Sequence, residues 1–429
     1  MVDAEVEIEN EEEIGNIPEE EKKEILKSVS LDELPKKKAG RPKKDLPTPE
    51  EVTTMSDKEI IDNLDSKTKS LYNDFSSFLE KKTDITPDTG TKSTISTGFD
   101  VLDAVMGGGF AIGTLGVITG APGSGKPMLA VQALAKAQEI YDGNILTAYL
   151  DSEEAITTSR MANLGVVRPK LKPYNDVTVE KVFKFLEGIC LFKEEKKIID
   201  TPTVIVWDSI ANTLSQKERE VEDINSVIGY KARLLSILIP KYVAKLAIWN
   251  ICMLAINQLR DVIQIGMFSA PKELKFMSSG KDMPGGNVLK FNAFHLLEMN
   301  VKEVIKPDKF GFEGIVSKVK CVKNKLFRPN IEVALVGDFS TGFSNFWTNF
   351  RFLADNKRLE TSAWNYLIDL PNKKFRTVDA QQLYKDEPIF KEAWDKAVSE
   401  TIKSEIVEKY AVEEPADINS SNLEKDKNK

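Results

Sequence analysis

The sequence predicts an α/β protein with a mainly parallel central sheet, and two observations lead to this fold class. From about Ser93, short apolar runs alternate with stretches of helical periodicity, as in parallel strands joined by helices. A glycine-rich turn also stands between one such run and a helical stretch. The expected parallel strands are Leu115–Thr119, Ile145–Leu150, Val204–Trp207 and Met253–Ile256.

Three later apolar segments have few helical residues between them, so the sheet is expected to continue in antiparallel strands. These segments are Ala293–Val301, Gly314–Val322 and Ile331–Val336. The core is therefore expected over residues 93–340. Residues 341–410 carry aromatic anchors, among them Trp347, Trp364 and Trp394, and predict a small C-terminal domain.

Both ends of the chain have compositions that predict disorder. Residues 1–55 combine a Glu-rich stretch with a basic run, and too few apolar groups are present to offset the entropy of ordering. Within the basic run, Gly40-Arg41-Pro42 resembles an AT-hook, which would give affinity for DNA or another polyanion, although a solvated spacer or a nuclear localisation patch has the same composition. The polar tail over residues 411–429 is also expected to be disordered.

A helix is predicted near the start of residues 56–92, from Ser56 to about Lys81. Ser56 and Glu59 have the spacing of a capping box. Phe75 and Phe78 belong to an apolar stripe at helical spacing. The stripe packs either on the chain's own core or on a neighbouring subunit, and we expect subunit docking.

Composition excludes several classes of protein. The 429 residues include 41% hydrophobic ones, but no apolar run approaches the ~20 residues that span a bilayer, so no membrane partner is expected. The N-terminus is acidic and has no signal-peptide pattern, and the three cysteines are far apart, which favours a reduced, cytoplasmic setting. His295 is the only histidine and cannot by itself supply a zinc site or a Ser-His-Asp triad. With a net charge of -8, nucleic-acid binding would have to come from local basic clusters.

The glycine-rich turn fits the phosphate-binding pattern G-x-x-x-x-G-K, in the strand–turn–helix context that makes this motif specific. Its residues are Gly120, Ala121, Pro122, Gly123, Ser124, Gly125 and Lys126. Glycines let backbone N–H groups approach phosphate oxygens, and the helix N-terminus adds a favourable dipole. We therefore expect ATP at this loop, with Lys126 on the β- and γ-phosphates.

The residue after the lysine departs from the pattern. Pro127 stands where a Ser or Thr hydroxyl normally binds Mg²⁺, and Met128 cannot replace it. Proline is tolerated in the first turn of a helix, so the fold should survive. Hydrolysis is expected to be slow, unless a rearranged loop presents Ser124 to the metal instead.

Acidic residues end two of the expected strands, where an NTPase needs them. Asp208 directly follows the run Val204–Trp207 and is expected to hold the metal ion and its bound water near the phosphates. Asp151-Ser152-Glu153 ends the preceding strand, and Glu153 is our choice to orient the attacking water.

Taken in order, these segments resemble the RecA recombinase family, and within it the phage branch of UvsX-like proteins, over about residues 94–336. The resemblance rests on Thr94–Asp103, Asp151–Glu153, the set Ser226, Gly229, Ala232, Arg233 and Ser236, Ile256–Arg260, Gly285–Asn287 with Lys290 and Phe291, and Val322–Lys325. It implies a RecA-like P-loop NTPase core.

The resemblance also implies roles for individual residues. Gln258 would sense the γ-phosphate, and Lys323 and Lys325 would reach the ATP of a neighbouring subunit. Two DNA-binding loops are implied, with Arg233, Arg260, Gly285, Gly286 and Asn287 in this sequence, and the composition of the segment between Arg260 and Gly285 adds Met267 and Phe268. Arg160 departs from the family pattern because it stands where an adenine-stacking tyrosine is expected.

The segment Leu259–Pro284 also has the composition of a single-strand-binding loop. Cations that meet phosphates alternate in it with Met and Phe side chains that can touch bases. A loop of about 25 residues without structure is uncommon in a compact domain unless it is functional. It is also longer than the family pattern, which puts its individual DNA contacts in question.

The expected function is therefore an ATP-dependent, single-stranded-DNA-binding recombinase. It would form helical homo-oligomeric filaments, use ATP and Mg²⁺, and pair bound strands with duplex DNA, together with mediator and single-strand-binding proteins. A phage-encoded protein would act in the host cytoplasm. Two alternatives are a ring-forming ATPase of the helicase or clock type, and a DNA-binding filament protein that has lost hydrolysis.

Overall fold

The structure is a computed structural model that describes residues 92–154, 156–167, 171–221, 227, 229–261, 277 and 281–410. The extension expected over residues 1–55, the helix expected from Ser56 and the tail expected over residues 411–429 lie outside these ranges. Met267 and Phe268 lie outside them too.

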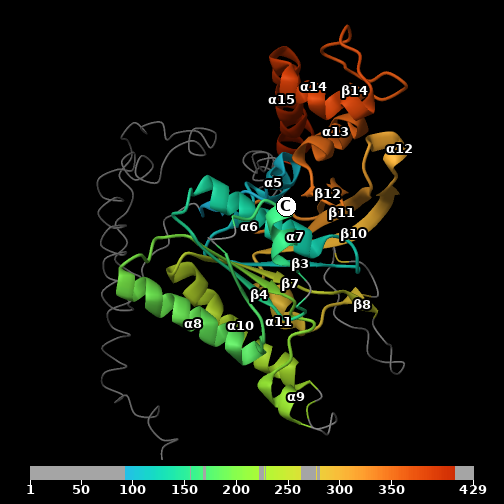
Figure 1. The fold of residues 1–429 in the computed structure, drawn as a ribbon. Coiled ribbons are helices and arrows are strands. Elements are labelled where there is room, and N and C mark those ends of the chain that lie inside the picture. Colours follow the sequence, from blue (N-terminus) through green and yellow to red (C-terminus); the bar gives the residue numbers. More distant parts are fainter. Residues whose placement is uncertain are drawn as a thin grey trace, which may run out of the picture. The chain divides into compact units, whose positions relative to one another are not determined.

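Within the described residues, the main sheet has nine strands in the order β13-β12-β11-β10-β3-β7-β6-β4-β5 (Figure 1). Neighbouring strands from β10 to β5 in this order are parallel. Their bounds are β3 (Leu115–Gly120), β4 (Leu146–Asp151), β5 (Lys172–Tyr174), β6 (Thr203–Asp208), β7 (Ile251–Ile256) and β10 (His295–Ile305). The α/β fold class with a mainly parallel sheet is confirmed.

The sheet continues in the antiparallel strands β11 (Gly314–Lys323), β12 (Ile331–Asp338) and β13 (Gly342–Phe343). β10 differs from the expectation, since it pairs in parallel with β3 on one side and antiparallel with β11 on the other. The reason is the crossover through α11 (Asn287–Asn292), which returns the chain to the end of the sheet where β3 begins.

Helices cover both faces of the parallel strands. α6 (Lys126–Ile140) packs on one face, and α8 (Val179–Lys196) and α10 (Tyr230–Ile248) pack on the other (Figure 1). In β6, Val204 and Val206 enter the core under α6, whereas Ile205 and Trp207 enter the core under α8 and α10. A strand buried on both faces is continuously apolar, which explains the uninterrupted run in the sequence.

Shorter elements complete the part of the chain that precedes the C-terminal unit. They are β1 (Thr94–Ile95), α5 (Asp100–Met106), β2 (Phe110–Ala111), α7 (Thr158–Asn163), α9 (Gln216–Glu220), β8 (Arg260–Asp261), β9 (Lys281–Asp282) and α12 (Pro307–Phe310).

The C-terminal unit is a helical cluster built around aromatic side chains. Phe346 stacks on Trp394 with ring centroids 4.8 Å apart, and this core extends to Val316 of β11 and Val336 of β12. Its elements are α13 (Asn345–Asp355), β14 (Leu359–Glu360), β15 (Tyr366–Leu367), η3 (Thr377–Asp379), α14 (Ala380–Asp386), α15 (Pro388–Ile402) and η4 (Lys403–Glu408).

Candidate functional site

The carboxyl ends of the central parallel strands meet at one edge of the sheet. The register places Asp151 opposite Asp208, and Ile118 opposite Ile256. The residues that follow these strand ends therefore lie at the same edge. They are the loop after Gly120, Glu153, Ser209 and Gln258.

The glycine-rich loop Gly120–Lys126 connects β3 to α6. Gly120 has φ 145°, and a Cβ there would collide with the carbonyl oxygen of Met299, so this position requires glycine. Gly123 (φ 72°) borders open space, and Gly125 (φ 84°) is the N-cap of α6. The first turn of α6 has backbone N–H groups without intrahelical acceptors, and the helix dipole favours an anion there. This geometry fits a bound phosphate group.

Lys126 lies within the loop. Its Nζ donates hydrogen bonds to the carbonyl oxygens of Gly120 at 3.0 Å and Ala121 at 2.7 Å, and the residue is 5% exposed. Burial lowers the pKa of Lys126, while the nearby Asp208 and Glu153 carboxylates raise it. The cation is thus held next to the backbone of the loop by acceptors that a phosphate oxygen could replace.

α6 forms with Pro127 in its first turn. The backbone N–H of Leu129 still donates to the carbonyl oxygen of Gly125 at 2.9 Å, so the proline does not interrupt the helix. Ser124 is fully buried and its hydroxyl donates to the carbonyl oxygen of Ala121 at 2.8 Å. In this arrangement neither Pro127 nor Ser124 presents a hydroxyl ligand for Mg²⁺.

Asp208 is the remaining candidate ligand, and its environment is unusual. The carboxylate is 6% exposed and accepts a hydrogen bond from the Tyr149 hydroxyl at 2.5 Å. Burial raises the pKa of Asp208 to about 6, with Glu153 and Asp151 adding to the rise, whereas the Tyr149 hydrogen bond and Lys126 oppose it.

Metal binding at this edge would need more than protein ligands. No group of three or more His, Cys, Asp and Glu side chains in the described part of the chain is arranged to hold a metal ion. A magnesium ion beside Asp208 would take its other oxygen ligands from phosphate and water, as Mg²⁺ commonly does.

Glu153 is held by the loop that follows β6. Its Oε1 accepts hydrogen bonds from the Ser209 hydroxyl at 2.7 Å and from Asn212 Nδ2 at 2.6 Å. The roles of Ser209 and Asn212 are not predicted from the sequence, although polar residues directly after a strand-ending acid are a usable signal. The role of Tyr149 is not predicted either, because a tyrosine inside an apolar strand looks like a core residue.

Gln258 and Arg260 follow β7 at this edge. The Asn257 side chain ties this segment to the later one, because its Nδ2 donates to the carbonyl oxygen of Pro284 at 2.8 Å. Arg260 is exposed and begins β8, which pairs with β9. The two ends of the long segment between Arg260 and Gly285 are therefore close together beside the glycine-rich loop.

The other described residues that are expected to contact DNA lie next to these segment ends. Arg233 is exposed in the first turn of α10. Gly285 and Gly286 precede α11, whose first residue is Asn287. A Cβ added to Gly285 would lie 3.0 Å from Leu235 Cδ1, so this glycine permits close packing of α11 against α10.

The two lysines expected to reach a neighbouring subunit differ in their contacts. Lys323 Nζ donates to the carbonyl oxygens of Lys290 at 3.0 Å and Phe291 at 2.6 Å, near the C-terminus of α11. Lys325 is exposed, and its Nζ lies 5.6 Å from the centre of the Phe294 ring. To act on a neighbour, Lys323 would have to leave two hydrogen bonds, whereas Lys325 would have to leave only its contact with the Phe294 ring.

Arg160, in α7, lies near the start of α6. Its Nη1 donates to the carbonyl oxygen of Ser340 at 2.6 Å, and its Nη2 lies 3.4 Å from the sulfur of Met128 in α6. A planar guanidinium can stack on a ring, so this position retains a group able to contact a base.

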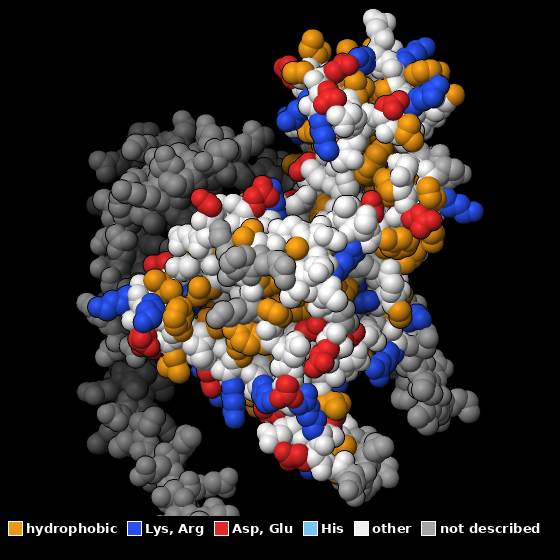
Figure 2. All heavy atoms as spheres, viewed as in Figure 1, with side chains coloured by type: hydrophobic (Ala, Val, Ile, Leu, Met, Phe, Trp, Pro, Cys, Tyr) orange, Lys and Arg blue, Asp and Glu red, His pale blue; other side chains and the backbone are white. Residues whose placement is uncertain are grey.

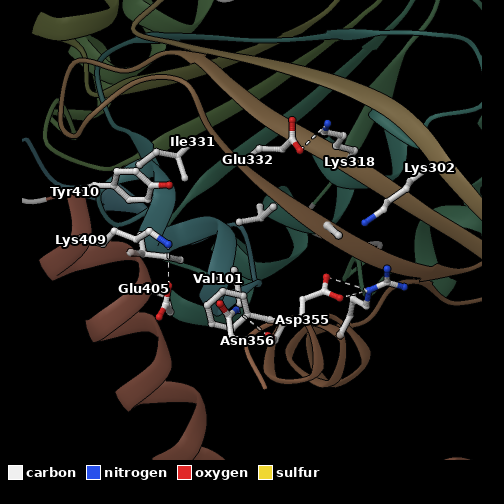
Figure 3. Close-up of a pocket in the computed structure, with 15 residues that line it drawn as sticks. Val101, Lys302, Lys318, Ile331, Glu332, Asp355, Asn356, Glu405, Lys409 and Tyr410 are labelled. Atoms are coloured by element: carbon white, nitrogen blue, oxygen red, sulfur yellow. Dashed lines mark hydrogen bonds and ion pairs between the residues drawn. The ribbon is translucent and has the colours of Figure 1, made fainter. Parts of the chain in front are cut away.

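A pocket of about 220 Å³ lies away from this edge, between the outer strands and the C-terminal helices (Figure 3). Three of its four lysine and arginine side chains pair with carboxylates: Lys318 with Glu332 at 2.6 Å, Arg351 with Asp355 at 2.9 Å, and Lys409 with Glu405 at 2.9 Å. The fourth cation on the lining is Lys302. Most of the positive charge of the pocket is therefore neutralised locally.

The comparisons with known proteins agree with the geometry. The family described as RecA N-terminal domain matches residues 81–344. RecA proteins of Mycoplasma pneumoniae, Crocosphaera subtropica and Borreliella afzelii are 32%, 31% and 35% identical over 238, 236 and 258 residues. The matches cover 55%, 55% and 59% of this chain but only 65%, 62% and 65% of those relatives. With the matching domain extending over more than half of its length, the chain belongs to the RecA family.

Proposed function

We propose that this protein is an ATP-dependent recombinase that binds single-stranded DNA, forms helical filaments and promotes homologous pairing and strand exchange. The observation that carries the proposal is the sheet edge at which the glycine-rich loop, Glu153, Asp208 and Gln258 meet. Membership of the RecA family supports it, because the family resemblance implies functional roles for Glu153 and Gln258.

In this proposal, the loop Gly120–Lys126 binds the phosphates of ATP and Asp208 holds the magnesium ion, which would stabilise charge on the phosphates. Glu153 orients the attacking water, and Gln258 reports the γ-phosphate to the DNA-binding segments. Lys323 and Lys325 act on the ATP of the neighbouring subunit, which makes the filament the active form. Phosphoryl transfer depends mainly on such positioning and electrostatics.

DNA binding is proposed to use local clusters. On the face shown in Figure 2, Lys and Arg side chains are interspersed with Asp and Glu, most densely around α9, and do not form one basic surface. Arg233 and Arg260 are exposed beside the ends of the predicted DNA-binding loops. Among the described helices none is long and apolar enough to cross a bilayer.

The assignment to the phage branch, and with it action in a host cytoplasm, is a finer proposal. Its support is the set of departures from the cellular pattern: Pro127, Arg160 and the long segment between Arg260 and Gly285. A protein that binds DNA but has lost hydrolysis is the second candidate, and the absence of a hydroxyl at position 127 favours it.

An ATPase assay with and without single-stranded DNA tests the proposal, run beside a Pro127→Thr variant. We expect slow turnover that DNA stimulates, and an increase on the order of 10²-fold in the variant, the size typical of one restored transition-state contact. Single-strand affinity, measured by fluorescence anisotropy, should rise with ATP and fall with salt as counterions are released. Equal DNA affinity with ATP, with ADP and without nucleotide would reject a recombinase. Native turnover that matches the variant would reject only our account of Pro127.

A further inference from the structure

The loop Ser209–Thr213 holds the carboxylate that is proposed to orient water. Both its Ser209 hydroxyl and its Asn212 amide donate to the same oxygen, Glu153 Oε1. The loop is closed on itself, because the Thr213 hydroxyl donates to the carbonyl oxygen of Ser209 at 2.7 Å. A displacement of this loop would therefore move Glu153 relative to the phosphates.

Lys231 fixes the backbone of this loop from outside. Its Nζ lies 3.3 Å from the carbonyl oxygen of Ile210, 2.9 Å from that of Ala211 and 3.1 Å from that of Thr213. A lysine ammonium has three N–H donors, so all three are used on one loop. A solvated surface lysine would not keep this geometry, because an ordered side chain loses rotamer entropy.

Lys231 also belongs to the part of the protein that is proposed to meet DNA. It lies in the first turn of α10, two residues before the exposed Arg233. Burial lowers the pKa of Lys231, Glu218 raises it, and Arg260 lowers it further, so the Arg260 charge acts on the same ammonium. Lys231 is thus connected to Arg233 through the backbone of α10, and to Arg260 through electrostatic repulsion.

The second predicted DNA-binding segment reaches the same loop through packing. A Cβ on Gly285 would lie 3.5 Å from Ile210 Cγ2 and 3.0 Å from Leu235 Cδ1, so the three residues form a close contact. The backbone N–H of Ile210 donates to the carbonyl oxygen of Ile256 at 2.9 Å, two residues before Gln258. The loop Ser209–Thr213 therefore contacts the ends of both segments.

We propose that the loop Ser209–Thr213 couples DNA binding to Glu153, and that Lys231 is the positioning residue that transmits the coupling. DNA bound at Arg233 shifts the first turn of α10, Lys231 carries the carbonyls of the loop with it, and Ser209 and Asn212 re-aim Glu153 at the attacking water. A misplacement of about 1 Å can change a rate by about 10²-fold, so a small shift is sufficient. This proposal rests on the proposed recombinase function and adds to it the regulation of the same site.

The test compares native protein with Lys231→Met, which keeps the aliphatic stem but removes the three donors, and with Lys231→Arg, which restores N–H donors and charge. Lys241→Met is the matched control, because Lys241 is exposed on the same helix and its Nζ lies over the Tyr242 ring at 5.6 Å. ATP turnover is measured with and without oligo-dT, and oligo-dT affinity with and without ATP. The first readout is the turnover with oligo-dT divided by the turnover without it. The second is the affinity for oligo-dT with ATP divided by the affinity without ATP.

We expect Lys231→Met to reduce the stimulation of turnover by DNA about tenfold or more, and Lys231→Arg to recover part of it. Because coupling between binding sites is reciprocal, the strengthening of DNA binding by ATP should also shrink. Affinity for oligo-dT without ATP should stay within about threefold of native, since Arg233 and Arg260 remain, and Lys241→Met should behave as native. If Lys231→Met does not fold, Lys231→Gln replaces it, with a smaller loss of the same ratio expected.

Native ratios in Lys231→Met would overturn the inference. So would an equal fall of turnover with and without DNA together with a lower melting temperature, because that pattern indicates a purely structural role. If native protein itself shows no effect of DNA on turnover and no effect of ATP on DNA binding, the proposed recombinase function is rejected. Failure of the proposed function is therefore seen in the native protein, whereas failure of the proposed coupling is seen only in the Lys231 variants.

Discussion

Asp208 occupies a position that is costly for a carboxylate, and its proposed role requires the charge. Its pKa is raised to about 6 from an ordinary 3.8, mainly by burial. The folded protein therefore binds a proton more tightly than the unfolded chain between these values, so stability falls as pH rises from about 4 to about 6. At neutral pH the ionised group destabilises the fold by about 2–3 kcal/mol.

Replacing Asp208 by Asn should lower ATP turnover and raise the stability of the fold. The amide oxygen can still accept the Tyr149 hydrogen bond, but the buried charge and the proposed metal ligand are lost. We expect ATP turnover to fall at least about 10²-fold, and the free energy of unfolding to rise by up to about 2 kcal/mol at pH 7.5. Urea unfolding at pH 7.5 and pH 4.5 checks this, because the gain should fall to about a third at the lower pH. A variant that is less stable than native at pH 7.5 would contradict the expectation.

At the scale of elements, Lys193 connects three parts of the fold. It lies in the last turn of α8, is fully buried, and donates to the carbonyl oxygens of Thr201 and Trp249 and to the Thr203 hydroxyl. Burial lowers its pKa to about 8. The contacts fix the end of α8 to the start of β6 and to the C-terminus of α10.

We expect Lys193→Met to lower the free energy of unfolding by about 2–4 kcal/mol, because buried carbonyl groups would lose their donor. The control is Lys196→Met, three residues on, where the side chain is 53% exposed and pairs with Glu195. Such an exposed pair contributes less than about 1 kcal/mol. Urea denaturation of both variants is the measurement, and equal effects would show that the buried contacts are not what stabilises this junction.

The bounds of the central parallel strands are the feature of the fold that the sequence predicts best, for a physical reason. β3, β4, β6 and β7 begin and end within two residues of the predicted runs, because a strand buried on both faces must be continuously apolar. Parallel pairing then places Glu153 and Asp208 at the same edge, so the core of the site followed from the pattern. The orientation of β10 could not be predicted this way, because an apolar run has the same composition in either direction.

The missed residues share a different property, which is that their function depends on partners distant in sequence. Lys231 and Lys193 look like solvated lysines on helices, and only the fold places carbonyl groups around them. Tyr149 is hidden for the same reason, since its hydroxyl meets Asp208, 59 residues away. Hydrophobic periodicity indicates which face of an element is buried, but it does not indicate which polar atoms of other elements lie against that face.

At the scale of the whole molecule, filament formation requires a contact between subunits, and we propose that the predicted helix from Ser56 to about Lys81 supplies it. Phe75 and Phe78 are three residues apart, so one helical face presents both rings, and such aromatic anchors dominate interfaces. Changing both to Ala should abolish filaments on single-stranded DNA in electron micrographs, while the melting temperature stays near native.

The matched control for this experiment is Ser76→Ala with Ser77→Ala, on the opposite face of the same predicted helix, which should leave filaments unchanged. The proposed action of Lys323 and Lys325 on a neighbouring subunit adds a second readout, because ATP turnover stimulated by DNA should fall together with the filaments. Filaments of native length in the Phe75→Ala, Phe78→Ala variant would exclude this helix as the subunit anchor. A large loss of melting temperature would instead show that the two rings pack on the chain's own core.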